Sequence, residues 1–200
     1  MPSDTEPEID WDSLTFSFTQ TDRMYMAKCE IGGEWEKGAM KDYEDLVISP
    51  AAGVLNYGQG LFEGLKAQRA SDGSIVLFRP QQNARRAQEG ARRLGMPPVP
   101  EEMFLDAVIS AVRENSRWVP PMGKGALYIR PLLMGSGPIL GVAPAPEYTF
   151  LVFTSPVGPY FKGGITPTSL RVSDKFHRAA PGGSGGCLLY TSDAADDTTG

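Results

Sequence analysis

The sequence has few of the residues that metal centres and disulfide frameworks require. It contains one histidine, His177, and two cysteines, Cys29 and Cys187, among 200 residues. A single histidine excludes a multi-histidine metal site. Two cysteines make no disulfide framework and fit a reducing compartment. No stretch approaches the roughly 18 consecutive apolar residues of a membrane-spanning helix, so none is expected.

Positive charge is also scarce. Lys and Arg number 19 against 24 Asp and Glu, which gives a formal net charge of -5. Nucleic-acid-binding proteins usually carry a basic surface, so this balance argues against that class. Residues 1–8 are acidic and contain no apolar stretch, unlike a secretory signal or an Arg-rich transit peptide. The expected compartment is therefore the cytoplasm, with an organellar form left open.

What the sequence does contain predicts an antiparallel sheet with two helices. The Asp72-Gly73 turn favours a hairpin between strands at 65–69 and 74–78. Pro80 suits the first position of a helix that Gly95 ends, and a second helix is expected over 100–115. The predicted buried faces of these helices are Ala84, Ala87, Ala91 and Leu94, then Phe104, Val108, Ala111 and Val112. Further strands are expected at 14–18, 25–30, 126–134 and 148–154.

The predicted fold class is α+β, with a small α/β domain and the truncated start of a second, β-rich domain. The domain boundaries follow from composition. We expect a disordered N-terminus at 1–10, the small domain at 11–154 and a Gly/Pro-rich linker at 155–167. The start of the second domain is expected at 168–186, with a strand at 169–172, and a non-native tail at 187–200. Residues 168–200 are too few to bury a core of their own.

Three groups of residues could carry chemistry. The first helix bears Arg85, Arg86, Arg92 and Arg93, which form either a solvated basic face or an anion site. The stretch from Tyr57 to Gly64 holds three glycines and two aromatics, which could be core or could contact a ligand. It matches no nucleotide-binding glycine motif.

The third group lies on one predicted strand. Tyr128 and Arg130 are two residues apart and therefore share a face of that strand. Arg130 interrupts an apolar run, and a charge in a buried strand is costly unless it is paired. Arg130 is thus either ion-paired within the protein or positioned for an acidic ligand.

Several long motifs, in order and in register, resemble the branched-chain amino-acid aminotransferases, which are class IV pyridoxal-phosphate enzymes. The resemblance covers residues 9–186 and is closest to the plant-like branch. It is carried by the segments Asn56-Tyr57-Gly58-Gln59-Gly60-Leu61-Phe62-Glu63-Gly64-Leu65-Lys66, Leu77-Phe78-Arg79-Pro80, Arg117-Trp118-Val119-Pro120-Pro121, Leu127-Tyr128-Ile129-Arg130-Pro131-Leu132-Leu133, Ala145-Pro146-Glu147-Tyr148-Thr149-Phe150 and Phe176-His177-Arg178-Ala179-Ala180-Pro181-Gly182-Gly183.

The resemblance implies a role for particular residues. Arg86 would contact the phosphate of pyridoxal 5′-phosphate. The residues implied around the substrate side chain and carboxylate are Tyr57, Phe62, Tyr128 and Arg130. Leu140 and Val142 would reach into the active site of a partner subunit, which implies a homodimer. The implied reaction transfers the amino group of Leu, Ile or Val to 2-oxoglutarate, giving the branched 2-oxo acid and glutamate.

One departure from the family pattern concerns catalysis directly. The family lysine that binds the cofactor and moves the substrate's α-proton would stand at Leu188, and no lysine follows it. Leucine has no amine, so we expect no catalytic residue and no activity in this chain. The tail from Cys187 contains no Lys or Arg and is similar to translated sequencing-adapter read-through. We expect it to have no stable packing.

Two alternative functions remain open. One is another class IV enzyme, such as a D-amino-acid aminotransferase or an aminodeoxychorismate lyase. The block from Leu127 to Leu133 and the stretch from Pro144 to Phe150 disfavour this alternative. The other is a non-catalytic small-domain protein that binds a partner. The expected ligands are amino acids and 2-oxo acids as small molecules, with no nucleic acid, membrane or metal.

Overall fold

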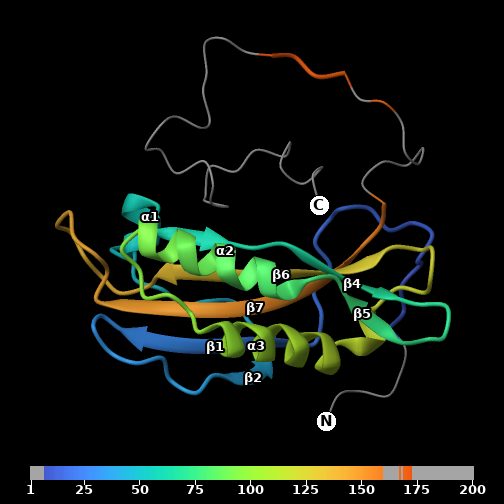
Figure 1. Ribbon diagram of the computed structural model, residues 1–200, viewed down its shortest axis with the longest axis horizontal. Coiled ribbons are helices and arrows are strands. Elements are labelled where there is room, and N and C mark those ends of the chain that lie inside the picture. The colour runs from blue at the N-terminus through green and yellow to red at the C-terminus, as the bar shows by residue number, and fades with distance from the viewer. Residues whose placement is uncertain (1–6, 160–166, 168, 173–200) are drawn as a thin grey trace.

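A computed structural model describes residues 7–159, 167 and 169–172 of the chain. Its strands form one antiparallel sheet in the order β2-β1-β7-β6-β4-β5, and the short strand β3 also pairs with β6 (Figure 1). The strands are β1 (Arg23–Glu30), β2 (Ala39–Asp42), β3 (Gly60–Phe62), β4 (Leu65–Arg69), β5 (Ile75–Leu77), β6 (Ala126–Gly135) and β7 (Glu147–Val157). The long central pair, β6 and β7, is joined along its whole length from Ala126↔Val157 to Gly135↔Tyr148.

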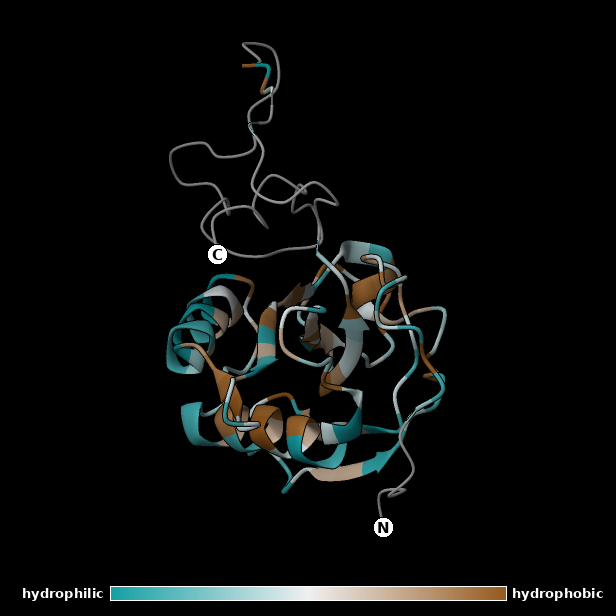
Figure 2. Cartoon of the chain, turned by 90° about the vertical axis from the view of Figure 1, so that its right-hand side faces the viewer, coloured by the Kyte–Doolittle hydropathy of each residue, from teal (hydrophilic) through white to brown (hydrophobic). Residues whose placement is uncertain are grey.

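Two helices, α2 (Pro80–Arg93) and α3 (Glu101–Glu114), cover one face of this sheet (Figure 1). A short helix, α1 (Gly53–Tyr57), and a 3-10 turn, η1 (Ser116–Trp118), complete the secondary structure of the described residues. Alanines on both helices are buried, which allows α2 and α3 to pack closely on each other and on the strands. In the end-on view of Figure 2, polar residues line the outer turns of the helices and apolar residues lie inside.

The core lies between the helices and the strands. Phe104 of α3 stacks on Phe150 of β7, with ring centroids 5.8 Å apart, and both side chains are almost completely buried. Along β6, buried residues alternate with partly exposed ones over residues 127–132. Leu127, Ile129 and Leu133 belong to the core on the helix side. Tyr128 and Arg130 therefore lie on the opposite face, which we call the outer face.

Local signals in the sequence located most of these elements correctly. The hairpin β4–β5 turns at Gly73, whose φ of +83° suits a glycine. Both helices start and end within about two residues of the predicted bounds, as expected for helix boundaries. Strand β7 continues to Val157, three residues into the predicted linker at 155–167.

Two predicted strands were wrong. Residues 14–18 form no strand, although Phe16 and Phe18 alternate with polar residues. Phe18 instead packs on Phe153 of the outer face, so the segment lies against that face of the sheet and does not extend its edge. The described residues 169–172 are exposed and also form no strand. Alternation at 14–18 thus reflects packing on a face of the sheet.

Candidate functional site

Three of the predicted site residues meet on the outer face of the sheet. Phe62 on β3 pairs with Leu132 of β6, which places its ring beside Arg130. The guanidinium carbon of Arg130 lies 4.3 Å from the centroid of the Phe62 ring and 5.2 Å from that of Tyr128. The Nη2 of Arg130 donates a hydrogen bond of 2.9 Å to the hydroxyl of Tyr128. The structure thus joins a cation, a hydroxyl and two aromatic rings in one cluster.

Arg130 is not neutralised inside the described part of the chain. No carboxylate among the described residues forms an ion pair with it. Its Nε is buried and has no hydrogen-bond partner among those residues. A buried donor without a partner carries a desolvation cost, and an anionic ligand would remove that cost. Of the two sequence alternatives for Arg130, the geometry favours the acidic ligand.

One residue of this cluster, Phe16, was not predicted from the sequence. The ring of Phe16 meets that of Tyr128 edge-on, with centroids 5.3 Å apart. The segment around Phe16 is held by the N–H of Gly158, which donates to the Thr15 carbonyl, and by the N–H of Thr19, which donates to the Ser155 hydroxyl. The alternation of Phe16 and Phe18 with polar residues was the available signal, but it predicts a strand equally well.

Tyr57 and Leu140 form a second group, and Val142 lies two residues after Leu140. The Tyr57 hydroxyl, at the end of α1, donates a hydrogen bond to the carbonyl oxygen of Leu140. Leu140 and Val142 are 82% and 96% exposed. Within the described residues, Tyr57 has no hydrogen bond or ring contact with Phe62, Tyr128 or Arg130. The role of Tyr57 beside the substrate, which the resemblance implies, therefore stays a prediction.

Arg86 forms a third group, on the helix side of the sheet. Its Nε and Nη2 donate to the two carboxylate oxygens of Glu63, both at 2.7 Å. The side chain of Glu63 is 1% exposed, whereas that of Arg86 is 44% exposed. Among the described residues, the neighbouring Arg85 forms an exposed ion pair with Glu101 at 3.3 Å. A partly exposed guanidinium held in a fixed plane fits a phosphate group.

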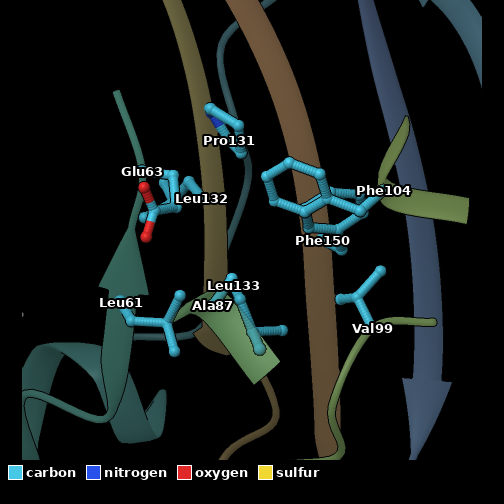
Figure 3. Close-up of a pocket in the computed structure, with 9 residues that line it drawn as sticks. All are labelled: Leu61, Glu63, Ala87, Val99, Phe104, Pro131, Leu132, Leu133 and Phe150. Carbon is cyan, nitrogen blue, oxygen red and sulfur yellow. The ribbon is translucent and has the colours of Figure 1, made fainter. Parts of the chain in front are cut away.

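A small internal pocket lies between the sheet and the helices near Glu63 (Figure 3). Its walls are mainly apolar, and the Glu63 carboxylate is its charged group. The space inside holds about one water-sized molecule, too little for a cofactor. The lining residues are Leu61, Glu63, Ala87, Val99, Phe104, Pro131, Leu132, Leu133 and Phe150.

The described residues show neither a metal centre nor a membrane span. They contain no cluster of three His, Cys, Asp or Glu side chains that could hold a metal ion. None of their helices is long and apolar enough to cross a membrane. Leu188, the preceding glycine loop, His177 and the tail at 187–200 lie outside the described residues.

No protein-family model matches the chain. Curated relatives do match. The chain is 59% identical over 188 residues to the chloroplastic branched-chain-amino-acid aminotransferase 5 of Arabidopsis thaliana, covering 94% of this chain and 45% of the relative. It is 55% identical over 184 residues to the mitochondrial branched-chain amino acid aminotransferase 1 of Humulus lupulus, covering 92% and 47%. A methionine aminotransferase of Arabidopsis thaliana is 50% identical over 184 residues, covering 92% and 52%.

Solved structures with a similar fold are also branched-chain aminotransferases. That of Thermoproteus uzoniensis with norvaline has a TM-score of 0.57 at 24% identity, over 71% of this chain and 43% of its own. Another, complexed with N-(5′-phosphopyridoxyl)-L-glutamate, has a TM-score of 0.51 at 26% identity, over 67% and 41%. The fold is therefore that of a class IV aminotransferase. The chain belongs to the branched-chain-amino-acid aminotransferases and spans about half the length of the curated relatives it matches.

Proposed function

We propose that the complete protein is a pyridoxal-phosphate-dependent transaminase of branched-chain amino acids. It would pass the amino group of Leu, Ile or Val to 2-oxoglutarate. The observation that carries this proposal is the cluster of Arg130, Tyr128 and Phe62 on the outer face. A guanidinium and a hydroxyl suit a carboxylate, and the adjacent aromatic rings suit an apolar side chain. Identity to curated aminotransferases supports the same reaction.

Each residue then has a role in binding and orientation. Arg130 and the Tyr128 hydroxyl hold the substrate carboxylate, while Phe62 and Phe16 exclude water from its side chain. Arg86 binds the cofactor phosphate. When bound, pyridoxal phosphate supplies the electron sink that makes the α-proton of the substrate acidic. An apolar pocket distinguishes poorly between side chains that differ by one methylene, which suits a class of substrates.

The chain as it stands lacks the group that would attach the cofactor and move that proton. Leu188 stands in the lysine's position. We therefore expect the 200-residue chain to show no transaminase activity and to retain no visible-absorbing cofactor after dialysis. Either signal would contradict this expectation. We also propose that a small domain ending near residue 154 and a second domain starting near residue 168 are the units of the complete protein.

The exposed residues Leu140 and Val142 support a homodimer of the complete protein, in which this loop contacts the partner's site. Sedimentation equilibrium of the complete protein tests this. A monomer at micromolar concentration, or a dimer unaffected by charged substitutions at both positions, would contradict it. The relatives include chloroplastic and mitochondrial proteins, so the cytoplasmic location expected from the N-terminus stays a prediction.

The deciding experiment for the activity starts from the gene. Sequencing the transcript past the Gly186 codon should reveal a Val-Lys-like pair and a further domain. The complete product is then assayed with 2-oxoglutarate and L-leucine, L-isoleucine, L-valine, L-methionine or D-alanine. We expect turnover of the branched L-amino acids. Activity on D-alanine alone would point to another class IV enzyme. Independent clones that all carry the same tail would point to a non-catalytic binding protein.

A further inference from the structure

The carboxylate of Glu63 is buried at the junction of the two layers, where its oxygens accept hydrogen bonds from side chains of α2. Arg86 donates to both oxygens at 2.7 Å, and Asn83 Nδ2 donates to Oε2 at 2.8 Å. A buried carboxylate is tolerated only with such partners. Two parallel bonds to one carboxylate also fix the plane of the guanidinium, which a single contact would leave free to rotate.

Glu63 is itself attached to the central strands of the sheet. Its N–H donates to the Pro131 carbonyl of β6 at 2.9 Å, directly after β3 ends. Asn83 also donates to the carbonyl of Gly64 at 3.3 Å, which ties α2 to the same segment. The orientation of Arg86 is thus set by the sheet as well as by its own helix.

The two partners differ sharply in exposure. The Glu63 side chain is 1% exposed and no ligand can reach it, whereas the Arg86 side chain is 44% exposed. Neighbouring Arg85 provides the contrast, because its partner Glu101 is itself a third exposed and offers a single contact at 3.3 Å. Of these two arginines, Arg86 alone combines access to solvent with a fixed plane.

We propose that Glu63 is a positioning residue that orients the Arg86 guanidinium to bind a phosphate monoester. This inference rests on the cofactor-phosphate role proposed for Arg86. Glu63 has two opposing effects on an incoming anion. Its negative charge repels the anion and weakens binding. Its hydrogen bonds hold the arginine side chain in one conformation, so that less conformational entropy is lost when the anion binds. The bidentate geometry and the burial of the carboxylate indicate that orientation outweighs repulsion.

The two effects predict opposite results for Glu63→Gln, which keeps the shape and removes the charge. If Glu63 acts by orientation, the variant binds phosphate monoesters more weakly. If it acts by repulsion, the variant binds them more tightly. The control is Glu101→Gln, which removes the carboxylate beside Arg85 and should change the affinity by less than about twofold.

The probe is pyridoxamine 5′-phosphate, which has no aldehyde and so forms no Schiff base with surface lysines. Pyridoxamine without phosphate serves as the negative ligand. The isotope-labelled 200-residue chain is titrated, and the Nε–Hε signal of Arg86 is followed by NMR. We expect saturable shifts with the phosphate ester only, and an affinity about three- to tenfold weaker in Glu63→Gln. A shift of equal size with pyridoxamine, no binding by the wild-type chain, or equal or tighter binding by the variant would overturn the proposal.

A measurement on the unmodified chain keeps the test valid if Glu63→Gln fails to fold. Without ligand, the Arg86 Nε–Hε should exchange slowly with solvent and show the relaxation of a rigid group, whereas that of Arg85 should exchange quickly. Equal exchange rates of the Nε–Hε protons of Arg86 and Arg85 would contradict the proposal. These readouts need no turnover. A complete protein without transaminase activity would therefore refute the proposed function and leave the Glu63 result standing.

Discussion

Gly64 lies so close to the hydroxyl oxygen of Tyr128 that a Cβ atom on the glycine would overlap it. Gly64 joins β3 to β4, and Lys66 of β4 pairs with Tyr128 of β6. The close approach lets the Tyr128 hydroxyl reach Nη2 of Arg130. The segment from Phe62 to Gly64 thus serves both sides of the sheet. Its first and last residues shape the outer cluster, and Glu63 between them holds Arg86.

Gly64→Ala should therefore destabilise the chain and displace Tyr128. The added methyl group cannot fit unless the tyrosine ring or the strand moves, and overpacking of this kind costs about 1–3 kcal/mol. Urea unfolding followed by circular dichroism gives the free energy, and the Arg130 Nη signals report the lost hydrogen bond. Gly141→Ala is the matched control, because nothing lies within 4 Å of the added carbon there. Equal stability of the two variants would contradict this account.

Elements with local signals could be predicted from the sequence. The turn at Asp72-Gly73 and the helix start at Pro80 need no distant partner, and both were confirmed. Tyr128 and Arg130 share a face because strand periodicity is two residues, and this prediction was also confirmed. The strand expected at 14–18 failed because alternation alone does not say whether a segment pairs at an edge or packs on a face.

The site was less predictable because it depends on register. Phe62 meets Arg130 only through the pairing of β3 with β6, which no local pattern in the sequence specifies. The pairing of Glu63 with Arg86 joins residues 23 positions apart on a strand end and a helix. The motif around Glu63 pointed to a functional segment, but a motif does not indicate that its glutamate is buried. The implied roles of Tyr57, Leu140 and Val142 stay predictions.

Phe104 offers a test of the core behind the site. Its ring stacks on Phe150 and lines the pocket beside Glu63 (Figure 3). Phe104→Ala should lower the free energy of unfolding by about 3–5 kcal/mol, since it removes buried apolar surface and leaves a cavity. Ile109→Ala on the same helix is the control, because Ile109 is 42% exposed and should cost much less. Chemical denaturation compares the two, and similar losses would show that the core lies elsewhere.

Acid stability should depend on Asp22. The Arg117 guanidinium, through bonds of 2.6 and 2.7 Å, and the Trp118 indole hold the pKa of this carboxyl below its ordinary value. A lowered folded-state pKa stabilises the protein above the ordinary Asp range, and that stability is lost as the pH falls through the folded-state pKa. Asp22→Asn should lower the free energy of unfolding by about 1.5–3 kcal/mol at neutral pH. In this variant the free energy of unfolding should also fall less steeply as the pH is lowered.

The matched variant for Asp22 is Asp42→Asn. Asp42 also pairs with an arginine, Arg23, but its side chain is 87% exposed and solvent screens the contact. Asp42→Asn should therefore leave the free energy of unfolding at neutral pH, and its decrease at acid pH, nearly unchanged. Thermal unfolding across a series of pH values measures both variants. If the free energy of unfolding of Asp22→Asn falls with pH as steeply as that of the wild type, other carboxyl groups cause the loss of stability in acid.

Gln59 should control the loop that carries Leu140 and Val142. Its Oε1 accepts the N–H of Ala145 at 3.0 Å, and its Nε2 donates to the Leu94 carbonyl at 3.2 Å, so one side chain ties this loop to the end of α2. Gln59→Leu keeps a similar volume and leaves both backbone groups without their partner. Hydrogen exchange of the Ala145 amide should speed up about tenfold, while amides in β7 change little.

The control for the loop is Gln81→Leu, an exposed position on α2. This variant adds the same apolar side chain at a position away from the loop. The hydrogen-exchange rate of the Ala145 amide should therefore match that of the wild type. In the complete protein, Gln59→Leu should also weaken the homodimer that we propose, because the loop must then lose more conformational entropy when it meets the partner. Faster Ala145 exchange with an unchanged dimer constant would show that the loop takes up its position only on contact with the partner.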